Sequence, residues 1–426
     1  MSGNGKKGRV LVIGGGISGV TAAIEASEVG CDVVLVEKNP YLGGRVAQMN
    51  QYFPKLCPPS CGLEINFRRI RTSPNIQCLT LSEVESVSGS PGNYQVAIRR
   101  DPRRVNNKCT ACGACVEACP VERRDEYNFG MSSTKAIYLP FATAYPTQYA
   151  IDGGVCPGAA CGKCVAACPY QAIDLEAKPE TFEVEVQAVI WATGWDPFDA
   201  AKIEGLGFGD YPNVISNVMM ERLASPDGPT AGKIERPSDG KEIDSVAFVQ
   251  CAGSRDENYL KHCSGVCCLG SLKQTRYVRE QYPDARIYIF YIDLRAPGRL
   301  EDFLAQVEDD EKVSFVKGKV AKITEDANSG DLVVEAEDTL SGDQVIRKVD
   351  LVVLATGIVP ADAGVRTEVG GDLQKDEHGF LTNAQPLAGL LAAGCAKRPV
   401  DVAACVRDAT GAALKALQNC VEKAGG

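Results

Sequence analysis

The residues best suited to chemistry in this chain are its cysteines, 19 in 426 residues. Two runs stand out: Cys109-x2-Cys112-x2-Cys115-x3-Cys119 and Cys156-x4-Cys161-x2-Cys164-x3-Cys168, each followed by proline. Thiolates two or three residues apart on a tight loop can reach three corners of a cubane iron–sulfur cluster, and a distant cysteine supplies the fourth. The runs therefore predict two [4Fe–4S] clusters in a small ferredoxin-like domain.

The ligands of each cluster follow from the two-run pattern, in which the last cysteine of each run binds the other cluster. The first predicted set is Cys109, Cys112, Cys115 and Cys168. The second predicted set is Cys156, Cys161, Cys164 and Cys119, with an unusually wide first gap. Structural zinc also favours Cys-x2-Cys pairs, but not four-cysteine runs that end in Cys-Pro twice. Three features oppose a disulfide framework: the odd number of cysteines, their tight clustering in the sequence, and the expected absence of a secretory signal.

A glycine pattern near the start predicts a dinucleotide site. Gly14-x-Gly16-x-x-Gly19 follows an apolar strand at 9–13 and opens a helix at 17–27. These glycines allow a tight turn, close approach of a pyrophosphate, and helix–strand contact, while the helix N-terminus favours phosphate. A second strand at 33–37 ends in Glu37, which is placed to accept hydrogen bonds from a ribose.

A third cysteine group comprises Cys251, Cys263, Cys267 and Cys268. Spacing alone leaves two interpretations open, a further cluster or free cysteines in a core. No second Gly-x-Gly-x-x-Gly occurs within 246–350, so we expect no cradle for NAD(P)H there.

Several segments resemble the flavoproteins that have two dinucleotide-binding domains, such as thioredoxin reductase. Gly43-Gly44-Arg45 resembles their continuation of the FAD site, and the Ala-Thr-Gly triplets at 192–194 and 355–357 resemble their inter-domain crossings. Gly394-Cys395 resembles their C-terminal flavin motif, with cysteine in place of the usual aspartate; a small buried residue is the alternative for Cys395. The resemblance implies an α/β fold with FAD bound by Gly14, Gly16, Ser18, Gly19, Glu37, Lys38, Gly44, Arg45, Thr193, Gly194, Gly394 and Cys395.

The cysteine-rich insertion, the missing nicotinamide fingerprint and the spacing Cys263-x3-Cys267-Cys268-x4-Lys273 together resemble the HdrA family, the flavin subunits of heterodisulfide reductase. That resemblance implies a third cluster on Cys251, Cys263, Cys267 and Cys268. It also implies a catalytic role for Lys273 beside the flavin ring, where a cation stabilises reduced, anionic flavin. Without the resemblance, Lys273 would be taken for a solvated helix residue.

The chain is most similar to the minimal, QmoA-like form of that family, from the quinone-interacting membrane-bound oxidoreductases of sulfate reducers. This similarity implies three partners: an HdrA-like second flavin subunit, a haem-bearing membrane subunit, and adenylylsulfate reductase. The net charge of -10 opposes nucleic acid as a partner, and no apolar stretch approaches the length of a membrane span. We therefore expect a cytoplasmic protein held at the membrane through a partner subunit.

The expected architecture divides the chain into five segments. They are a first FAD-binding part at 1–105, the ferredoxin-like insertion at 106–178, a return and linker at 179–245, a second α/β domain at 246–350, and a C-terminal FAD-binding part at 351–426. One strand is expected across 184–191, and 225–245 is expected to be a linker.

Three functions remain open at this stage. The first is an electron-transfer subunit of a complex, and the second is an NAD(P)H-dependent oxidoreductase of the glutamate-synthase small-subunit type. The third is an assembly scaffold in which FAD is structural. Cys57 and Cys61 add a further choice, between a redox dithiol and a structural role near the flavin, since the two prolines between them are stiff.

Overall fold

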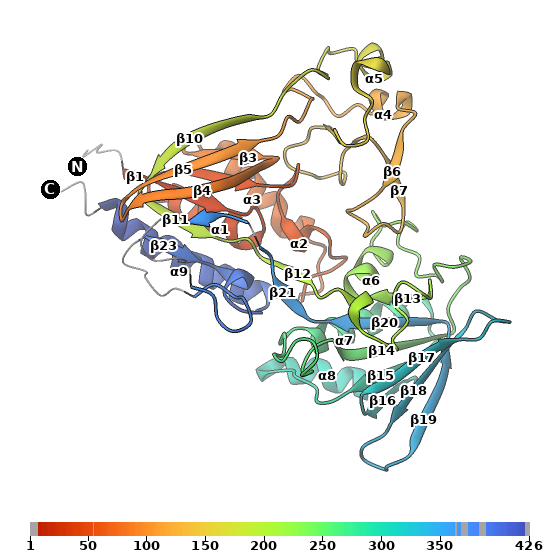
Figure 1. Cartoon of the computed structure of the whole chain (residues 1–426). Helices are drawn as coiled ribbons and strands as arrows, with labels where there is room; N and C mark the ends of the chain where they lie inside the picture. The colour runs from red at the N-terminus through yellow and green to blue at the C-terminus, as the bar shows by residue number, and fades with distance from the viewer. Residues whose placement is uncertain (1–6, 54, 363, 368–373, 383–388, 422–426) are drawn as a thin grey trace.

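The computed structural model describes residues 7–53, 55–362, 364–367, 374–382 and 389–421. It consists of a flavin domain, an insert that projects from it, and a second sheet domain (Figure 1). No described helix is long and apolar enough to cross a membrane.

The flavin domain is built on a five-stranded parallel sheet in the order β23-β11-β1-β2-β3. Its strands are β1 (Lys7–Ile13), β2 (Cys31–Glu37), β3 (Ile76–Thr80), β11 (Ala188–Trp191) and β23 (Leu390–Ala392). Helices α1 (Ile17–Glu28), α3 (Ser60–Thr72) and α9 (Val402–Val421) cover one face. The short helix α2 (Gly44–Ala47) follows the second strand.

The other face of this sheet packs against a second, mostly antiparallel sheet in the order β10-β5-β4-β22. Its strands are β4 (Ser82–Ser90), β5 (Asn93–Arg100), β10 (Glu180–Val186) and β22 (Arg366–Thr367). Successive side chains of β1 point to opposite faces of the sheet: Val10 and Val12 face the helices, whereas Leu11 and Ile13 face the antiparallel sheet. Apolar burial on both faces explains the unbroken apolar runs in the sequence.

The insert separates β5 from β10, and it contains two short helices, α4 (Ala114–Ala118) and α5 (Lys163–Ala167). It also holds two small antiparallel pairs, formed by β6 (Glu122–Arg124) with β7 (Ser133–Lys135) and by β8 (Ile137–Tyr138) with β9 (Ala150–Ile151). In Figure 1, β6 and β7 run from the tip of the insert toward the second sheet domain.

The second sheet domain has a parallel sheet in the order β13-β20-β14-β15-β16. Its strands are β13 (Val214–Ser216), β14 (Ser245–Ala252), β15 (Arg286–Tyr291), β16 (Val313–Lys317) and β20 (Leu351–Thr356). Helices α6 (Asn217–Leu223), α7 (Cys267–Gln281) and α8 (Glu301–Glu308) lie on one face. The other face carries β17 (Val320–Glu325), β18 (Leu332–Glu337) and β19 (Gln344–Val349).

Two crossings join the flavin domain to the second sheet domain. Strands β12 (Trp195–Pro197) and β21 (Ile358–Pro360) pair antiparallel directly after the two Ala-Thr-Gly triplets. Both triplets therefore end at the junction between the domains.

Three expectations about these elements were wrong. The strand expected across 184–191 is two strands in different sheets, β10 and β11, which separate at Gln187. Strand β20 pairs with β13 and β14, so boundaries at 246 and 350 would divide one sheet. The segment 225–245 is no free linker, because Ile234 and Ile243 are fully buried in the second sheet domain.

Candidate flavin and iron–sulfur site

A cavity of about 740 Å³ opens where the flavin domain, the insert and the second sheet domain meet. This volume is in the range of small-molecule and cofactor sites. The structure brings most of the predicted FAD residues to its wall: Gly14, Gly16, Ser18, Glu37, Lys38, Gly44, Arg45, Thr193, Gly194 and Cys395. Lys273 and Cys267 of the second sheet domain line the same cavity.

The glycine turn has the features of a phosphate cradle. A Cβ at Gly19 would lie 1.7 Å from the carbonyl oxygen of Gly14, so Gly19 is required for helix–strand contact. A Cβ at Gly16 would meet no protein atom closer than 3.9 Å, although Gly16 lines the cavity. Its missing side chain therefore leaves space at the N-terminus of α1, where a pyrophosphate binds favourably.

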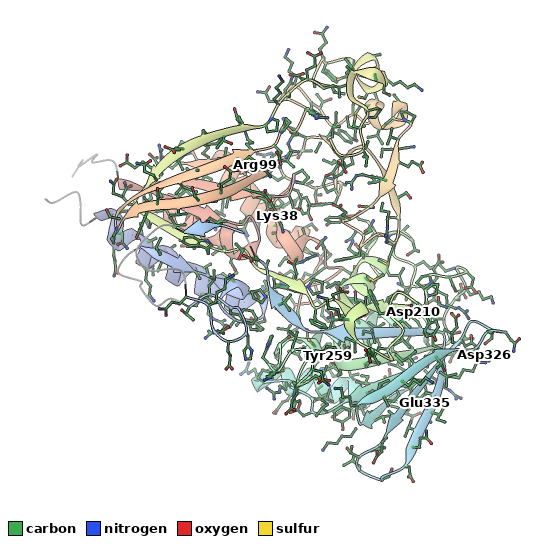
Figure 2. All side chains as sticks on the ribbon, viewed as in Figure 1. Lys38, Arg99, Asp210, Tyr259, Asp326 and Glu335 are labelled. Carbon is green, nitrogen blue, oxygen red and sulfur yellow. The ribbon has the colours of Figure 1, made fainter. Side chains whose placement is uncertain are left out.

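Glu37 ends β2 beside this turn and is buried. One carboxylate oxygen accepts the Gly15 N–H at 2.6 Å, and the other accepts both the backbone and side-chain N–H groups of Asn39 at 2.7 and 2.8 Å. Burial raises the pKa of Glu37, and these hydrogen bonds partly oppose that rise. A carboxylate has about four acceptor positions, so capacity remains for a ribose hydroxyl. Lys38, which is labelled in Figure 2, follows directly and also lines the cavity.

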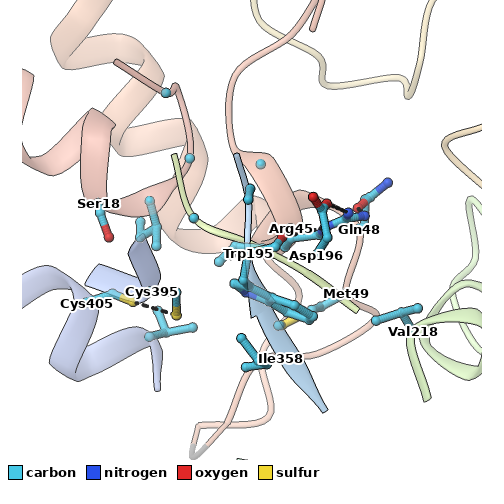
Figure 3. Close-up of a pocket in the computed structure, with 18 of the residues that line it drawn as sticks. Ser18, Arg45, Gln48, Met49, Trp195, Asp196, Val218, Ile358, Cys395 and Cys405 are labelled. Atoms are coloured by element: carbon cyan, nitrogen blue, oxygen red, sulfur yellow. Dashed lines mark hydrogen bonds and ion pairs between the residues drawn. The ribbon is translucent and has the colours of Figure 1, made fainter. Parts of the chain in front are cut away.

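Arg45 stands at the crossing between the domains (Figure 3). It forms an ion pair with Asp196, and its Nη1 donates to Gln48 Oε1 at 3.1 Å. Its guanidinium also lies 5.7 Å from the ring centroid of Phe129 and 5.8 Å from that of Trp195. Arg45 thus holds together residues of the flavin domain, the insert and the first crossing.

The C-terminal motif brings two thiols together at the cavity wall (Figure 3). Cys395 and Cys405 are both buried, with their Sγ atoms 3.7 Å apart. The pKa of Cys395 is raised by its hydrogen bond with Cys405 and by burial, so this thiol stays neutral. Cys395 is therefore small and buried, and it also faces the cavity. Gly394 does not line the cavity, and its N–H donates to the Asp408 carboxylate at 2.8 Å.

Lys273 is a buried residue of α7, not a solvated one. Its side chain is 5% exposed, and its Nζ lies 2.9 Å from Oε1 of Glu221, whose side chain is 8% exposed. The same ammonium donates to the carbonyl of Gln51 at 2.5 Å. Sequence reasoning missed Glu221, because a single carboxylate on α6 has no motif around it. Both residues line the cavity, so the structure places a buried ion pair against the cofactor space.

The first predicted cluster set meets in a second, smaller cavity. This cavity, of about 20 Å³, is lined by all four of its members, Cys109, Cys112, Cys115 and Cys168. Burial, followed by the neighbouring Cys109 thiolate, raises the pKa of Cys115 to about 11. A cationic iron centre would supply the countercharge that such thiolates lack.

Three members of the second set lie together in the insert. Cys164, Cys119 and Cys156 are part of its small core, together with Cys168 of the first set, whereas Cys161 is not part of that core. Burial raises the pKa of Cys164, and the Cys156 and Cys119 thiolates raise it further. Among the described residues, no three His, Cys, Asp or Glu side chains converge tightly enough for a single metal ion. Cubane ligands each bind a different iron, so a cluster does not require that convergence.

The third cysteine group lies between the parallel sheet of the second sheet domain and the flavin cavity. Cys251 is the next-to-last residue of β14 and has a φ of 57°, and Cys267 and Cys268 begin α7. Burial, followed by the Cys268 thiolate, raises the pKa of Cys251 to about 11, and Cys263 contributes in the same direction. Burial also raises the pKa values of Cys267 and Cys268, and these thiols together with Cys251 and Cys263 are a chemically suitable donor set for a cluster. Cys267 is the member that faces the flavin cavity.

Cys57 and Cys61 do not lie at the flavin cavity. Cys61 is exposed, Cys57 is half-buried, and the cavity wall formed by the described residues includes neither. This position favours a role other than direct dithiol exchange with the flavin.

Known proteins agree with this arrangement. Residues 9–55 match the family of FAD dependent oxidoreductases, and residues 102–122 match the 4Fe-4S binding domain. The chain is 40% identical over 419 residues to HdrA 2 of Methanopyrus kandleri, a CoB–CoM heterodisulfide reductase iron–sulfur protein, covering 96% of this chain and 64% of that protein. It is 39% identical over 417 residues to HdrA of Methanocaldococcus jannaschii, covering 95% and 63%.

The chain is therefore similar to HdrA proteins of heterodisulfide reductase over nearly its whole length. It spans slightly less than two thirds of the length of these relatives. The matches identify an oxidoreductase chain whose cofactors are FAD and [4Fe–4S] clusters.

Solved structures establish the fold. Thioredoxin reductase of Lactococcus lactis has a TM-score of 0.54 at 13% identity, covering 98% of this chain and 100% of that one. Thioredoxin reductase of T. acidophilum has a TM-score of 0.53 at 12% identity, covering 99% and 100%. The predicted thioredoxin-reductase-like α/β fold with a ferredoxin-like segment is thus confirmed.

Sequence reasoning also missed the contribution of the insert to the flavin cavity. The insert residues on its wall are Arg123, Asp125, Glu126, Tyr127, Phe129, Tyr138 and Pro140. They come from the segment between the two cysteine runs, which carries no recognisable motif.

Proposed function

We propose that this chain is the flavin and iron–sulfur electron-transfer subunit of an HdrA-like complex of the Qmo type. The observation that carries the proposal is the shared cavity. The phosphate turn of the flavin domain, Lys273 of α7 and Cys267 of the third cysteine group all line it. FAD exchanges electrons in pairs, whereas each cluster carries one at a time.

In this proposal, the cysteines of the insert hold two clusters with the ligand sets given above. The third cluster is held by Cys251, Cys263, Cys267 and Cys268. Lys273 lies beside the flavin ring, where its charge stabilises the reduced anionic form. The buried ion pair with Glu221 supports this role, because it fixes the position of the ammonium at the cavity wall.

The second sheet domain lacks the glycine turn that the NAD(P)H-dependent alternative requires. In dinucleotide-binding domains a glycine turn leads from the first strand directly into a helix. Here β14 ends at Ala252, directly after Cys251, and α7 begins only at Cys267. The loop between them contains no Gly-x-Gly-x-x-Gly.

The proposed partners are an HdrA-like second flavin subunit, adenylylsulfate reductase and a haem-bearing membrane subunit. Electrons would pass between sulfur metabolism and a quinone-linked membrane protein. The names of the relatives refer to CoB–CoM heterodisulfide, so that reaction defines the competing assignment.

Purification without air and anaerobic titration test the proposal. About twelve irons per FAD are expected for three cubanes, and about eight would eliminate the third cluster. NADH should leave the flavin oxidised, whereas dithionite should bleach it. Rapid bleaching by NADH would favour the glutamate-synthase-like alternative. Co-purification with a haem-bearing membrane subunit supports the Qmo assignment, and co-purification with a heterodisulfide-reducing subunit contradicts it.

A further inference from the structure

The insert reaches the flavin cavity through the β6–β7 hairpin and the strand that follows it. This hairpin leaves the cysteine helices and runs toward the domain junction (Figure 1). Arg123 lies on β6 and Tyr138 ends β8, and both line the cavity. The domain that carries the cysteine runs therefore also builds part of the cofactor wall.

Arg123 is a buried cation with unused hydrogen-bonding capacity. Its side chain is only 8% exposed, and its Cζ lies 4.2 Å from the Tyr138 ring centroid. The nearest carboxylates are those of Asp152 at 3.5 Å and Glu126 at 3.9 Å, and the Glu126 side chain is 87% exposed. Nη1 donates to the carbonyl of Arg124 at 3.2 Å, but the buried Nε has no hydrogen-bond partner. A guanidinium has five N–H donors, and the two on Nη2 have no hydrogen-bond partner among the described residues, so they are available to a ligand.

The position of Tyr138 indicates which part of the ligand Arg123 would meet. Tyr138, Glu37 and Tyr41 all line the cavity, and the Tyr41 ring, which follows the ribose-binding end of β2, lies 5.4 Å from the ring of Phe141, three residues beyond Tyr138. Arg103, in the segment that leads into the insert, donates to the carbonyl of Pro40, which directly precedes Tyr41. In dinucleotide folds this end of the second strand holds the adenosine ribose.

We propose that Arg123 belongs to the FAD site and binds the adenosine half of the cofactor. Its planar guanidinium rests on the Tyr138 ring and presents N–H donors to ribose, adenine or phosphate acceptors. Planar, weakly hydrated guanidinium groups suit this task better than ammonium groups. The inference concerns FAD alone and does not depend on the proposed electron-transfer partners.

This arrangement couples the insert to the cofactor. A ligand that binds only the native arrangement of a segment stabilises it, and the coupling is reciprocal. FAD should therefore stabilise the β6–β7 hairpin, and distortion of the hairpin should weaken FAD binding.

The test uses the full chain, purified without air, stripped of flavin and titrated with FAD, ADP and FMN. Arg123→Ala should weaken FAD and ADP about tenfold or more, as expected for loss of a charged hydrogen bond. FMN lacks the adenosine half, so its affinity should not change. Arg124→Ala removes the adjacent, exposed arginine and should bind all three ligands like the parent.

Two further measurements keep the test decisive. The iron content of each variant shows whether the insert has folded. If Arg123→Ala loses iron, Arg123→Gln replaces it, because glutamine keeps a long polar side chain. Limited proteolysis within 122–139 should slow when FAD is added to the parent but not when FMN is added. Unchanged FAD and ADP affinities in an iron-replete Arg123 variant would overturn the proposal, as would an equal loss of FMN affinity.

Discussion

The buried pair of Lys273 and Glu221 allows a prediction with two independent readouts. The pair is almost fully excluded from water, with the charged atoms 2.9 Å apart. Glu221 also accepts hydrogen bonds from Gln274 Nε2 at 2.7 Å and from the Asn50 N–H at 3.1 Å. Removing one member leaves the other as an uncompensated buried charge, which costs about 3–5 kcal/mol.

The stability readout is a double-mutant cycle. Lys273→Met and Glu221→Gln should each lower the Tm of the anaerobic holoprotein, by on the order of 10 °C if the second sheet domain unfolds as a unit of about 200 residues. Combining them removes both charges, and replacing a whole buried pair is often nearly neutral. The double variant should therefore lose much less than the sum of the single losses. Lys322→Met, at an exposed position of β17 in the same domain, should leave the Tm unchanged.

The redox readout separates charge from packing. A unit charge about 10 Å from the flavin ring, at an effective dielectric constant of about 20, is worth roughly 1.7 kcal/mol. For a two-electron couple this corresponds to about 35 mV. Spectroelectrochemistry should show a lower flavin midpoint potential for Lys273→Met, because reduced anionic flavin loses a cation. Glu221→Gln should shift the potential upward. Potential shifts in the same direction would refute the placement of this pair beside the flavin, and stability losses that simply add would refute the coupling between Lys273 and Glu221.

Two other predictions test the cysteine sets and the domain junction. Cys115→Ser and Cys268→Ser should each remove about four irons per chain, measured by chemical analysis, while FAD is retained. Cys78→Ser is the control and should leave the iron content unchanged, because this thiol lies outside the predicted sets and packs against the flavin-domain core. Loss of iron on Cys78→Ser, or none on Cys268→Ser, would contradict the assignment. Arg222→Met should lower the Tm by an amount similar to the single variants above, because it leaves the Asn128 side chain and the Gln48 and Asp227 carbonyls without their buried donor. An unchanged melting curve would show that this junction carries little stability.

The predictable parts of the molecule are those specified by short-range spacing. The turn from Gly14 to Gly19 needs particular backbone geometry within six residues, and the cysteine runs place several ligands on one loop. The pairing of Cys168 with the first run stays a prediction from a recurrent two-run topology, and it is supported by the four thiols lining one cavity.

The features that could not be predicted from the sequence depend on long-range packing. Strand β20 is buried throughout and apolar except for Thr356, as is expected of a strand buried on both faces, so its sequence does not identify the sheet it joins. Glu221 and Arg123 each lie far along the chain from the glycine turn, and the fold alone brings them to the cavity. The burial of Lys273 likewise depends on α6 and the loop at Gln51, which α7 contacts only in the folded protein.

The junction around Arg222 explains how one cavity can be shared by three parts of the chain. Arg222 is 1% exposed, and its guanidinium lies 4.6 Å from the Tyr127 ring centroid. It donates to Asn128 Oδ1 at 2.8 Å and to the Gln48 carbonyl at 3.3 Å, so α6 is tied to both the insert and the flavin domain. Tyr127 completes the link, because its hydroxyl donates to the Ala47 carbonyl at 2.6 Å.

Electron transfer requires this kind of rigidity, because tunnelling rates fall steeply with the separation between redox centres. A buried cation bonded to neutral acceptors in two other segments resists small displacements, since each displacement would leave polar groups unsatisfied. The Arg222–Tyr127 contact therefore holds the insert, with its cysteine sets, against α6 at the domain junction. Helix α7 of the second sheet domain contributes Cys267 to the cavity wall, so this junction joins the two parts of the chain that carry the predicted cluster ligands.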